Sequence, residues 1–343
     1  MNRRSFLAAA SSATAWAQSG GMARIDVQSH LYCPDILAFM EKRGGSPWAY
    51  RKDGERYVEV GKWTRRVLPK HTDVAAKVAD MDAAGIAVTL LSINDPGPEL
   101  FGADGPKVAR FAHDFLASVC RSHPGRFHGL ATLPLQDMEA SLAELDRVVQ
   151  KYDFRGILLY SNLDGHWPDE PMFRPLFRRA EQMGIPILLH PAYPMIFDAT
   201  AGYDLWGSIG LMTDSTIALA RIILSGILDE HPRLKLVCPH VGGTAPYLIG
   251  RMDHQAMVLK RGAERIKRPP SEYLKQIWLD AVSPLPQAIR FGLDFVGPDR
   301  MLYASDHPWV DPKLIASCID KLSLPADQQR QIFADNARKL FRL

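Results

Sequence analysis

Eight short apolar segments recur along the chain, and longer segments with the periodicity of an amphipathic helix lie between them. This alternation limits the possible folds more than any other feature, because strands that alternate with helices form a parallel sheet. Eight such units over roughly 320 residues predict an α/β fold of the (β/α)8 TIM-barrel type. The expected strands are residues 25–28, 87–92, 127–132, 156–160, 186–190, 234–239, 277–280 and 301–304. The expected helices include residues 72–84, 106–123, 138–152, 172–183, 212–230, 243–260 and 326–341.

A doubly wound open sheet is the alternative architecture, but its first strand would be followed by a Gly-rich phosphate-binding turn. This chain has the sequence QSHLYCP at that place. Residues 44–71 interrupt the alternation with short alternating runs around Asp53-Gly54 and Gly61-Lys62. Such a pattern predicts a small antiparallel β insertion after the first strand. The expected organisation is therefore one barrel domain over residues 22–343 that contains this insertion.

The N-terminal sequence MNRRSFLAAASSATAWAQ has the features of an export signal. An arginine pair precedes a weakly apolar Ala/Ser run, and Ala15-Trp16-Ala17 fits a small-x-small cleavage site. We expect a twin-arginine signal peptide over residues 1–17 and a periplasmic mature protein. A general secretory signal or a disordered tail is the alternative.

The charge of the remaining chain gives little reason to expect a polyanionic partner. The formal net charge is +3, and Arg3 and Arg4 contribute two of these charges, so the rest carries about +1 (3 − 2). We therefore expect no nucleic acid and no membrane among the partners. No stretch after the N-terminus has the ~18 to 20 consecutive apolar residues expected of a membrane span.

Residues with metal-binding side chains end four of the predicted strands. Gln28 and His30 lie two positions apart on the first strand and so share one face. His190 ends the fifth strand, His240 follows the sixth, and Asp306 follows the eighth. The C-terminal strand ends of a TIM barrel meet at one mouth, and imidazole and carboxylate groups are ordinary ligands of zinc and similar ions. Each residue alone could be a packed histidine or a helix cap, but together they predict a divalent metal site.

The sequences DVQSH, ILLHP, CPHVGG and YASDHPW, in this order and spacing, resemble the amidohydrolase superfamily. They are most similar to its amidohydrolase-related branch, which contains aminocarboxymuconate-semialdehyde decarboxylase. The resemblance spans almost the whole mature chain, including FHGLATLPLQD and the closing DNARKLFRL. It implies a metal held by His30, His190 and Asp306, with His240 handling water and protons beside it.

The resemblance also implies how a substrate is held. Arg65, in the GKWTRR sequence of the insertion, matches an arginine that binds the substrate carboxylate. The family is homodimeric, and a second arginine comes from the neighbouring subunit. That arginine is not clearly matched here, although Lys260 and Arg261 lie close to its position in the sequence.

Gln28 departs from the family, which usually has histidine at this position and has glutamate in some decarboxylases. An amide oxygen is a poor ligand for zinc beside imidazole, so Gln28 would be the weakest ligand of the set. Three outcomes are open. The site holds Zn²⁺ with three good ligands and a weak amide oxygen, it holds a metal such as Mn²⁺ that better tolerates oxygen ligands, or it holds no metal.

These residues predict a metal-dependent non-oxidative decarboxylase, a carboxy-lyase, acting on a small unsaturated or aromatic carboxylic acid. Arg65 would orient the substrate carboxylate, and His240 and Asp306 are the groups available for proton transfer. One alternative is a metal-dependent hydrolase or hydratase of a lactone, an ester or a C=C bond on the same barrel. The other is a metal-free ligand-binding protein, because Gln28 replaces a ligand. The sequence identifies neither the substrate nor the metal.

Overall fold

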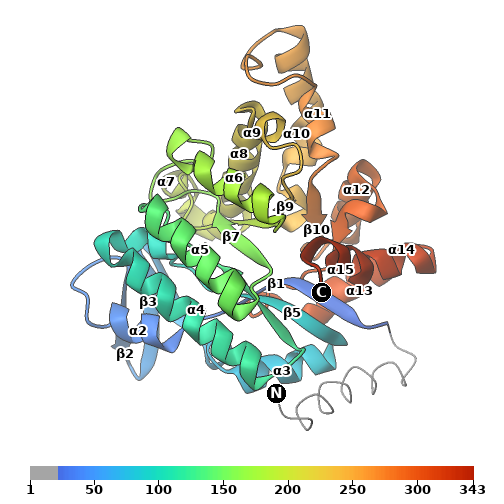
Figure 1. Ribbon diagram of the computed structural model, residues 1–343. Helices are drawn as coiled ribbons and strands as arrows, with labels where there is room; N and C mark the ends of the chain where they lie inside the picture. The colour runs from blue at the N-terminus through green and yellow to red at the C-terminus, as the bar shows by residue number, and fades with distance from the viewer. Residues whose placement is uncertain (1–21) are drawn as a thin grey trace.

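The computed structural model describes residues 22–343, and the export signal predicted over residues 1–17 lies outside this range (Figure 1). Eight parallel strands form one sheet whose order follows the chain. The (β/α)8 prediction is confirmed, and each expected strand is present with ends that differ by a few residues at most. The strands are β1 (Arg24–Leu31), β5 (Ile86–Ile93), β6 (Phe127–Ala131), β7 (Gly156–Tyr160), β8 (Ile187–His190), β9 (Leu236–Cys238), β10 (Trp278–Asp280) and β11 (Met301–Leu302).

The first and last strands meet and close the barrel along what we call the seam, formed by β1 and residues 303–308. Ser29 and His307 form an isolated parallel bridge there. Asp306 N donates to Gln28 O over 3.0 Å, and His30 N donates to His307 O over 2.8 Å. Two of the three segments that carry predicted metal ligands, β1 and the segment after β11, are therefore joined directly through their main chains.

Amphipathic helices surround the barrel and cover the outer faces of its strands (Figure 1). Strand leucines such as Leu90, Leu158 and Leu188 are buried in the core, and burial of such apolar surface is the main stabilising contribution. The longer helices are α3 (Val74–Ala83), α4 (Gly105–Ser122), α5 (Met138–Tyr152), α6 (Arg174–Met183), α8 (Leu211–Leu224), α10 (Ala245–Asp253), α12 (Pro286–Val296) and α13 (Pro312–Asp320). The shorter helices are α2 (Pro34–Met40), α7 (Phe197–Thr200), α9 (Ile227–Glu230), α11 (Pro270–Leu274), α14 (Ala326–Arg330) and α15 (Asn336–Phe341).

The predicted helix over residues 212–230 is divided in the structure. Gly226 has a φ of +80°, a left-handed conformation that ends α8 and starts the separate helix α9. The other two long predictions, residues 243–260 and 326–341, contain wider π-helical turns at His254–Val258 and Gln331–Asp335.

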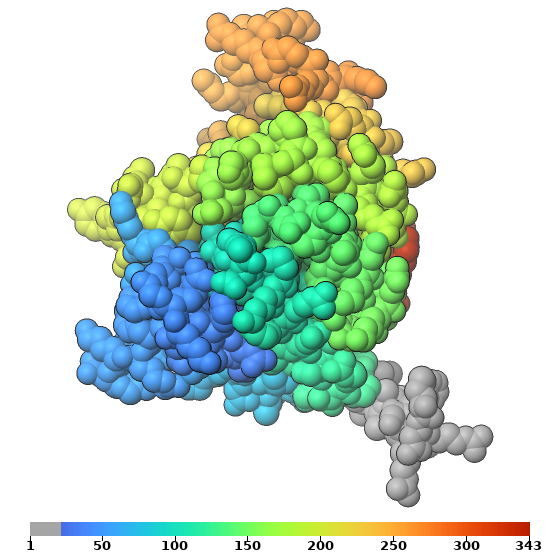
Figure 2. Space-filling view, turned by 60° about the vertical axis from the view of Figure 1, so that its left-hand side comes forward, coloured from blue at the N-terminus to red at the C-terminus, as the bar shows by residue number. Residues whose placement is uncertain are grey.

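The predicted insertion is a three-stranded antiparallel sheet of β2 (Trp48–Lys52), β3 (Glu55–Val60) and β4 (Trp63–Val67). In Figure 2 its residues belong to the blue area beside the barrel. Asp53 and Gly54 both have positive φ angles, which a tight two-residue hairpin turn requires. Burial alternates along β4, with Arg65 on the buried side. The insertion therefore turns Arg65 inward rather than toward solvent.

One helical run does not fit the expectation that no later stretch could span a membrane. Residues 206–224, which end with α8, have the length and the mean hydropathy, 1.3, of a membrane span. However, Asp214 within this run is fully buried and accepts hydrogen bonds from Ser161, Asn162 and Met195 N. These bonds fasten the helix to the end of β7 and to the β8–α7 loop, as expected of a helix that packs on a barrel.

Candidate active site at the barrel mouth

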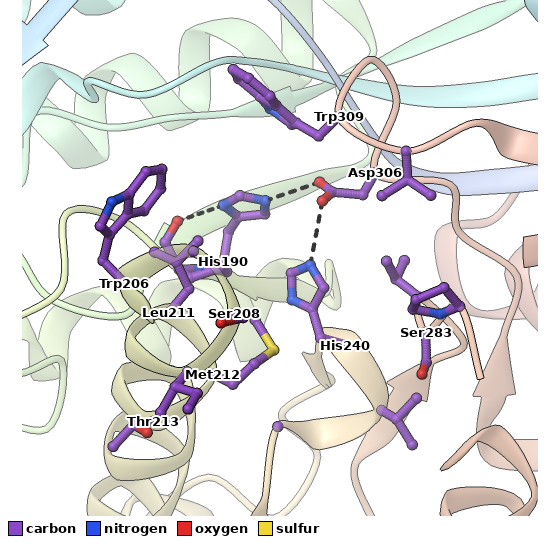
Figure 3. A pocket seen from close by; sticks show the side chains of 18 of the residues that line it. His190, Trp206, Ser208, Leu211, Met212, Thr213, His240, Ser283, Asp306 and Trp309 are labelled. Carbon is purple, nitrogen blue, oxygen red and sulfur yellow. Dashed lines mark hydrogen bonds and ion pairs between the residues drawn. The ribbon is translucent and has the colours of Figure 1, made fainter. Parts of the chain in front are cut away.

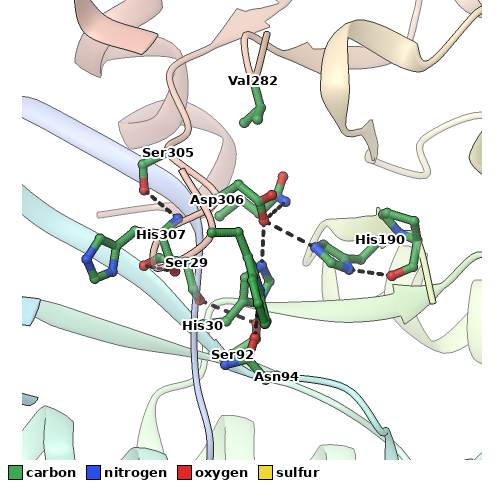
Figure 4. Close-up of polar contacts among 12 residues, drawn as sticks. Ser29, His30, Ser92, Asn94, His190, Val282, Ser305, Asp306 and His307 are labelled. Carbon is green, nitrogen blue, oxygen red and sulfur yellow. Dashed lines mark hydrogen bonds and ion pairs between the residues drawn. The ribbon is translucent and has the colours of Figure 1, made fainter. Parts of the chain in front are cut away.

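Three of the four predicted ligand residues converge on the carboxylate of the fourth, Asp306. Gln28 Nε2 donates to Asp306 Oδ1 over 2.9 Å, and His30 Nε2 lies 3.1 Å from the same oxygen (Figure 4). His190 Nε2 lies 3.6 Å from it. Ligand atoms of the two histidines and Asp306 all lie within 4.8 Å of one another. The structure thus brings residues from β1, β8 and the segment after β11 within reach of one ion.

Two buried atoms test whether these residues fit a divalent cation. Gln28 Oε1 and His190 Nε2 have no hydrogen-bond partner, although burying an unpartnered polar atom costs free energy. Both atoms carry lone pairs that a cation would accept, and two imidazoles with one carboxylate are a usual donor set for zinc. The residues therefore fit a metal. Gln28 presents its nitrogen to Asp306, so its oxygen reaches the ion only after the amide turns over.

Neighbouring groups orient the two ligand imidazoles. His30 Nδ1 lies 2.7 Å from Ser92 Oγ, and His190 Nδ1 donates to Pro191 O over 2.7 Å. Because a carbonyl can only accept, the hydrogen of neutral His190 is on Nδ1, and the Nε2 lone pair faces Asp306. This is the tautomer that metal binding requires.

The electrostatics of the site favour a neutral His30 beside an ionised Asp306. Burial, together with the nearby His190, lowers the pKa of His30 to about 4. Burial would raise the pKa of Asp306, but the neighbouring imidazoles of His190, His240 and His30 outweigh it and hold that pKa well below its usual value. At neutral pH His30 and Asp306 therefore have the protonation states that a metal site requires.

His240 lies on the other oxygen of the same carboxylate. Its Nε2 is 3.5 Å from Asp306 Oδ2, and its ring points toward Asp306 in Figure 3. Burial lowers the pKa of His240, but the hydrogen bond to Asp306 and the negative charges of Asp306 and Asp280 raise it above the ordinary value. A histidine with this bias holds a proton more readily than His30 does.

Arg65 reaches the same pocket from the insertion. Its Nη2 donates to the main-chain oxygen of Asp95 over 3.1 Å and also bonds the Asp95 carboxylate. The guanidinium carbon lies 3.9 Å from the ring centre of Trp63 and 5.2 Å from that of Trp309. Trp309 is itself fixed by a 2.9 Å hydrogen bond to Asn94. The Arg65 guanidinium is thus fixed by its bonds to Asp95 and by its contact with the Trp63 ring.

These residues line one pocket of about 1010 Å³ at the barrel mouth. Its charged and ionisable lining residues are Arg65, Arg66, His71, Asp95, His190, His240 and Asp306. The rest of the wall is mainly apolar and includes Trp63, Trp206, Leu211, Met212, Val282, Phe291 and Trp309 (Figure 3). A pocket that combines arginine side chains with apolar walls suits a carboxylate attached to an apolar or aromatic body. Lys260 and Arg261 are exposed and do not line it.

Sequence reasoning missed several residues that support the site. Asp280, at the end of β10, is buried beside His240, and the same strand-end argument that selected His240 could have found it. Lys77 of α3 is buried, and its Nζ donates to Ser29 Oγ over 2.6 Å and lies 2.7 Å from His307 Nδ1. A lysine within a helix pattern gives no signal of this kind, because such lysines are usually exposed.

Comparison with known proteins agrees with this site. A family model described as amidohydrolase matches residues 25–343. The chain is 31% identical to the gamma-resorcylate decarboxylase of Rhizobium sp., over 93% of this chain and 98% of that one. It is 26% identical to the 2-amino-3-carboxymuconate-6-semialdehyde decarboxylase of Dictyostelium discoideum, over 83% and 82% of the two chains. The crystal structure of 5-carboxyvanillate decarboxylase from Novosphingobium aromaticivorans with manganese and a nitrobenzoic acid superposes with a TM-score of 0.80, at 27% identity over 94% and 97% of the chains.

Proposed function

The chain belongs to the amidohydrolase family, and from this membership we propose that it is a metal-dependent non-oxidative decarboxylase of a small aromatic carboxylic acid. The observation that carries the proposal is the placement of the His30–His190–Asp306 cluster, His240 and Arg65 around one largely apolar pocket. The similar proteins named above are all decarboxylases of carboxylic acids.

A divalent ion held by His30, His190 and Asp306 would supply Lewis-acid stabilisation of negative charge on a substrate oxygen. Arg65 binds and orients the substrate carboxylate through the guanidinium edge that faces the pocket. His240 holds a proton at Nε2 and delivers it to the ring carbon that carries the carboxylate. A π pair of the ring forms the new C–H bond. The bond between this carbon and the carboxylate then breaks, its electron pair returns to the ring and restores the aromatic system, and CO2 leaves. The apolar wall excludes water from this carbon.

For the metal we propose Zn²⁺ first, because imidazole donors dominate the cluster, and Mn²⁺ as the alternative. The oxygen donor of Gln28 supports manganese, as does the manganese in the structure of the related 5-carboxyvanillate decarboxylase.

We also propose that the protein is a homodimer. The exposed apolar side chains of Ile209, Tyr247 and Phe291, which line the same pocket, support this assembly.

We propose in addition that the chain is exported to the periplasm, on the basis of the arginine pair and the Ala-Trp-Ala site near its start. Fractionation of the source cells tests this independently of activity. Recovery of the uncleaved chain in the cytoplasm alone would contradict it.

The activity test uses the purified chain loaded with Zn²⁺ or with Mn²⁺ and a panel of hydroxybenzoic acids. We expect CO2 release with the matching phenol as product, and a loss of at least about 100-fold in His240→Ala. Chelation should abolish the activity and readdition of the metal should restore it. Products of hydrolysis or hydration in place of CO2, or CO2 release unchanged in His240→Ala, would overturn the proposal.

A further inference from the structure

His71 lies in the wall of the barrel-mouth pocket, although it is neither a predicted metal ligand nor one of the proton-transfer groups. It ends the short 3₁₀ turn Pro69–His71, which follows strand β4 of the insertion. Only 2% of its surface is accessible. A buried imidazole is costly unless its nitrogens find partners, so the contacts of this ring show what it can bind.

The main chain and two aromatic rings fix the His71 side chain. Leu68 N donates to His71 Nδ1 over 3.3 Å, and the main chain of His71 is itself tied down. His71 N donates to Leu68 O over 2.9 Å, and His71 O accepts from Tyr32 N over 2.8 Å. The imidazole centre lies 4.5 Å from the ring centre of Trp309 and 6.0 Å from that of Tyr32. A ring held on these sides keeps one orientation, which a binding group requires.

The free hydrogen-bond donor of this ring is Nε2. A main-chain N–H can only donate, so Nδ1 is the acceptor and the hydrogen of the neutral ring is on Nε2. Burial, together with the positive charge of Arg65, lowers the pKa of His71 to about 4, so the ring is neutral at pH 7. The bond from Leu68 is the only hydrogen bond to the ring within residues 22–343. The Nε2–H group is therefore available to the pocket.

The neighbouring Arg65 indicates which ligand this donor suits. Trp309 contacts both side chains, since its ring centre lies 4.5 Å from the imidazole centre and 5.2 Å from the guanidinium carbon. Arg65 is already bonded to the Asp95 carboxylate, which offsets part of its positive charge. A substrate carboxylate has two oxygens and gains a further hydrogen bond when a neutral donor lies beside the guanidinium. His71 and Arg65 together thus suit a carboxylate better than Arg65 alone.

We propose that His71 is a substrate-binding residue whose Nε2–H donates to the carboxylate of the substrate beside Arg65. The ligand it selects is a carboxylate on an apolar or aromatic body, as opposed to the same body without the acidic group. This inference rests on the proposed function in taking a carboxylic acid as the substrate, but it concerns binding and requires no turnover.

Two substitutions separate the two nitrogens of His71. His71→Asn keeps an acceptor near the position of Nδ1 and removes the donor, whereas His71→Gln places an amide N–H near the position of Nε2. The probes are benzoate and phenol, which lacks the carboxylate, and calorimetry on the metal-loaded full chain measures their dissociation constants. We expect benzoate to bind about 10-fold more weakly to His71→Asn and within about threefold of wild type to His71→Gln. Phenol should bind all three proteins within about twofold.

The control is His128→Asn, at a half-buried position of β6 that does not line the pocket. Benzoate binding that stays within twofold of wild type in His71→Asn overturns the proposal. So does a loss of equal size for benzoate and phenol, or an equal loss in His128→Asn. Wild-type protein that binds benzoate no more tightly than phenol also overturns it.

A measurement on the wild type remains decisive if His71→Asn does not fold. In proton–nitrogen NMR of the ¹⁵N-histidine-labelled full chain, with His71→Gln used to assign the signal, the His71 Nε2–H should shift downfield with benzoate and not with phenol. A signal that benzoate does not move overturns the proposal. Absence of CO2 release from every acid overturns the proposed function instead, and the binding of benzoate still decides the role of His71.

Discussion

At the scale of single residues, Gln28 is the position that most distinguishes this site. Its amide nitrogen bonds the same Asp306 oxygen that the histidines approach, and its own oxygen is buried without a partner. A metal therefore competes with an existing hydrogen bond and gains only a neutral amide oxygen in return. Gln28 is thus a weak ligand for two reasons. The neutral amide oxygen could be read from the residue type, whereas the hydrogen bond to Asp306 could not.

We expect Gln28→His to bind zinc at least about 10-fold more tightly than the wild type, because imidazole is the stronger ligand and has no amide to turn over. Competition with a coloured chelator measures the dissociation constants, and Gln136→His, at an exposed position, serves as the control. Equal or weaker binding in Gln28→His would show that residue 28 does not ligate the metal.

Glu99 gives the stability of the protein a specific pH dependence. Burial, together with the charge of Asp95, raises the pKa of Glu99 to about 8, so the folded protein holds this proton well above the ordinary pKa of 4.5. The resulting stabilisation is complete below about pH 4.5 and is lost as the pH rises through about 8, because the unfolded chain ionises first.

Glu99→Gln removes this pH-dependent loss of stability. The melting temperature of the variant minus that of wild type should therefore be larger at about pH 8.5 than at about pH 5. Thermal unfolding at both pH values measures the difference, with the exposed Glu264→Gln as the control. A difference that is the same at both pH values would mean that Glu99 does not hold a proton in the folded state.

At the scale of elements, the barrel could be predicted because its strands are continuous apolar runs and its helices have clear amphipathic periods. The residues at the ends of β1, β8 and β9 followed from the same logic, since parallel strands present their carboxyl ends at one edge. The break of the helix at Gly226 could not be predicted, because an isolated glycine near a helix end does not reveal its φ angle. The pairing of Arg65 with Asp95 was equally hidden, since it joins the insertion to a loop 30 residues away.

The seam depends on a lysine from outside it. Lys77 Nζ contacts Ser29 Oγ on one side and His307 Nδ1 on the other, which joins α3 to both halves of the metal site. We expect Lys77→Met to leave these acceptors unpartnered, to lower the free energy of unfolding by about 1–3 kcal/mol and to weaken metal binding. Denaturant titration and metal competition measure the two effects.

The exposed Lys42→Met is the control for this substitution, because it removes the same charge from the surface. Metal affinity that is unchanged in Lys77→Met would show that the seam keeps its geometry without the lysine.

At the scale of the whole molecule, the metal should couple to global stability, because its ligands come from strands on opposite sides of the barrel closure. A ligand that binds only the folded chain stabilises it by about 2.7 kcal/mol at a free concentration of 100 times its dissociation constant. We therefore expect added Zn²⁺ or Mn²⁺ to raise the melting temperature, and His190→Ala to remove the effect. Scanning calorimetry with and without the metal measures it. A shift of equal size in His190→Ala would place the bound ion elsewhere.

The seam also has a consequence for when the site can exist during protein synthesis. Gln28 and His30 leave the ribosome early, whereas Asp306 emerges only after nearly the entire barrel has been translated. An ion captured by the nascent polypeptide would lack its carboxylate partner, so maturation of the centre must follow translation. Premature termination anywhere ahead of the last strand would yield a product unable to assemble it.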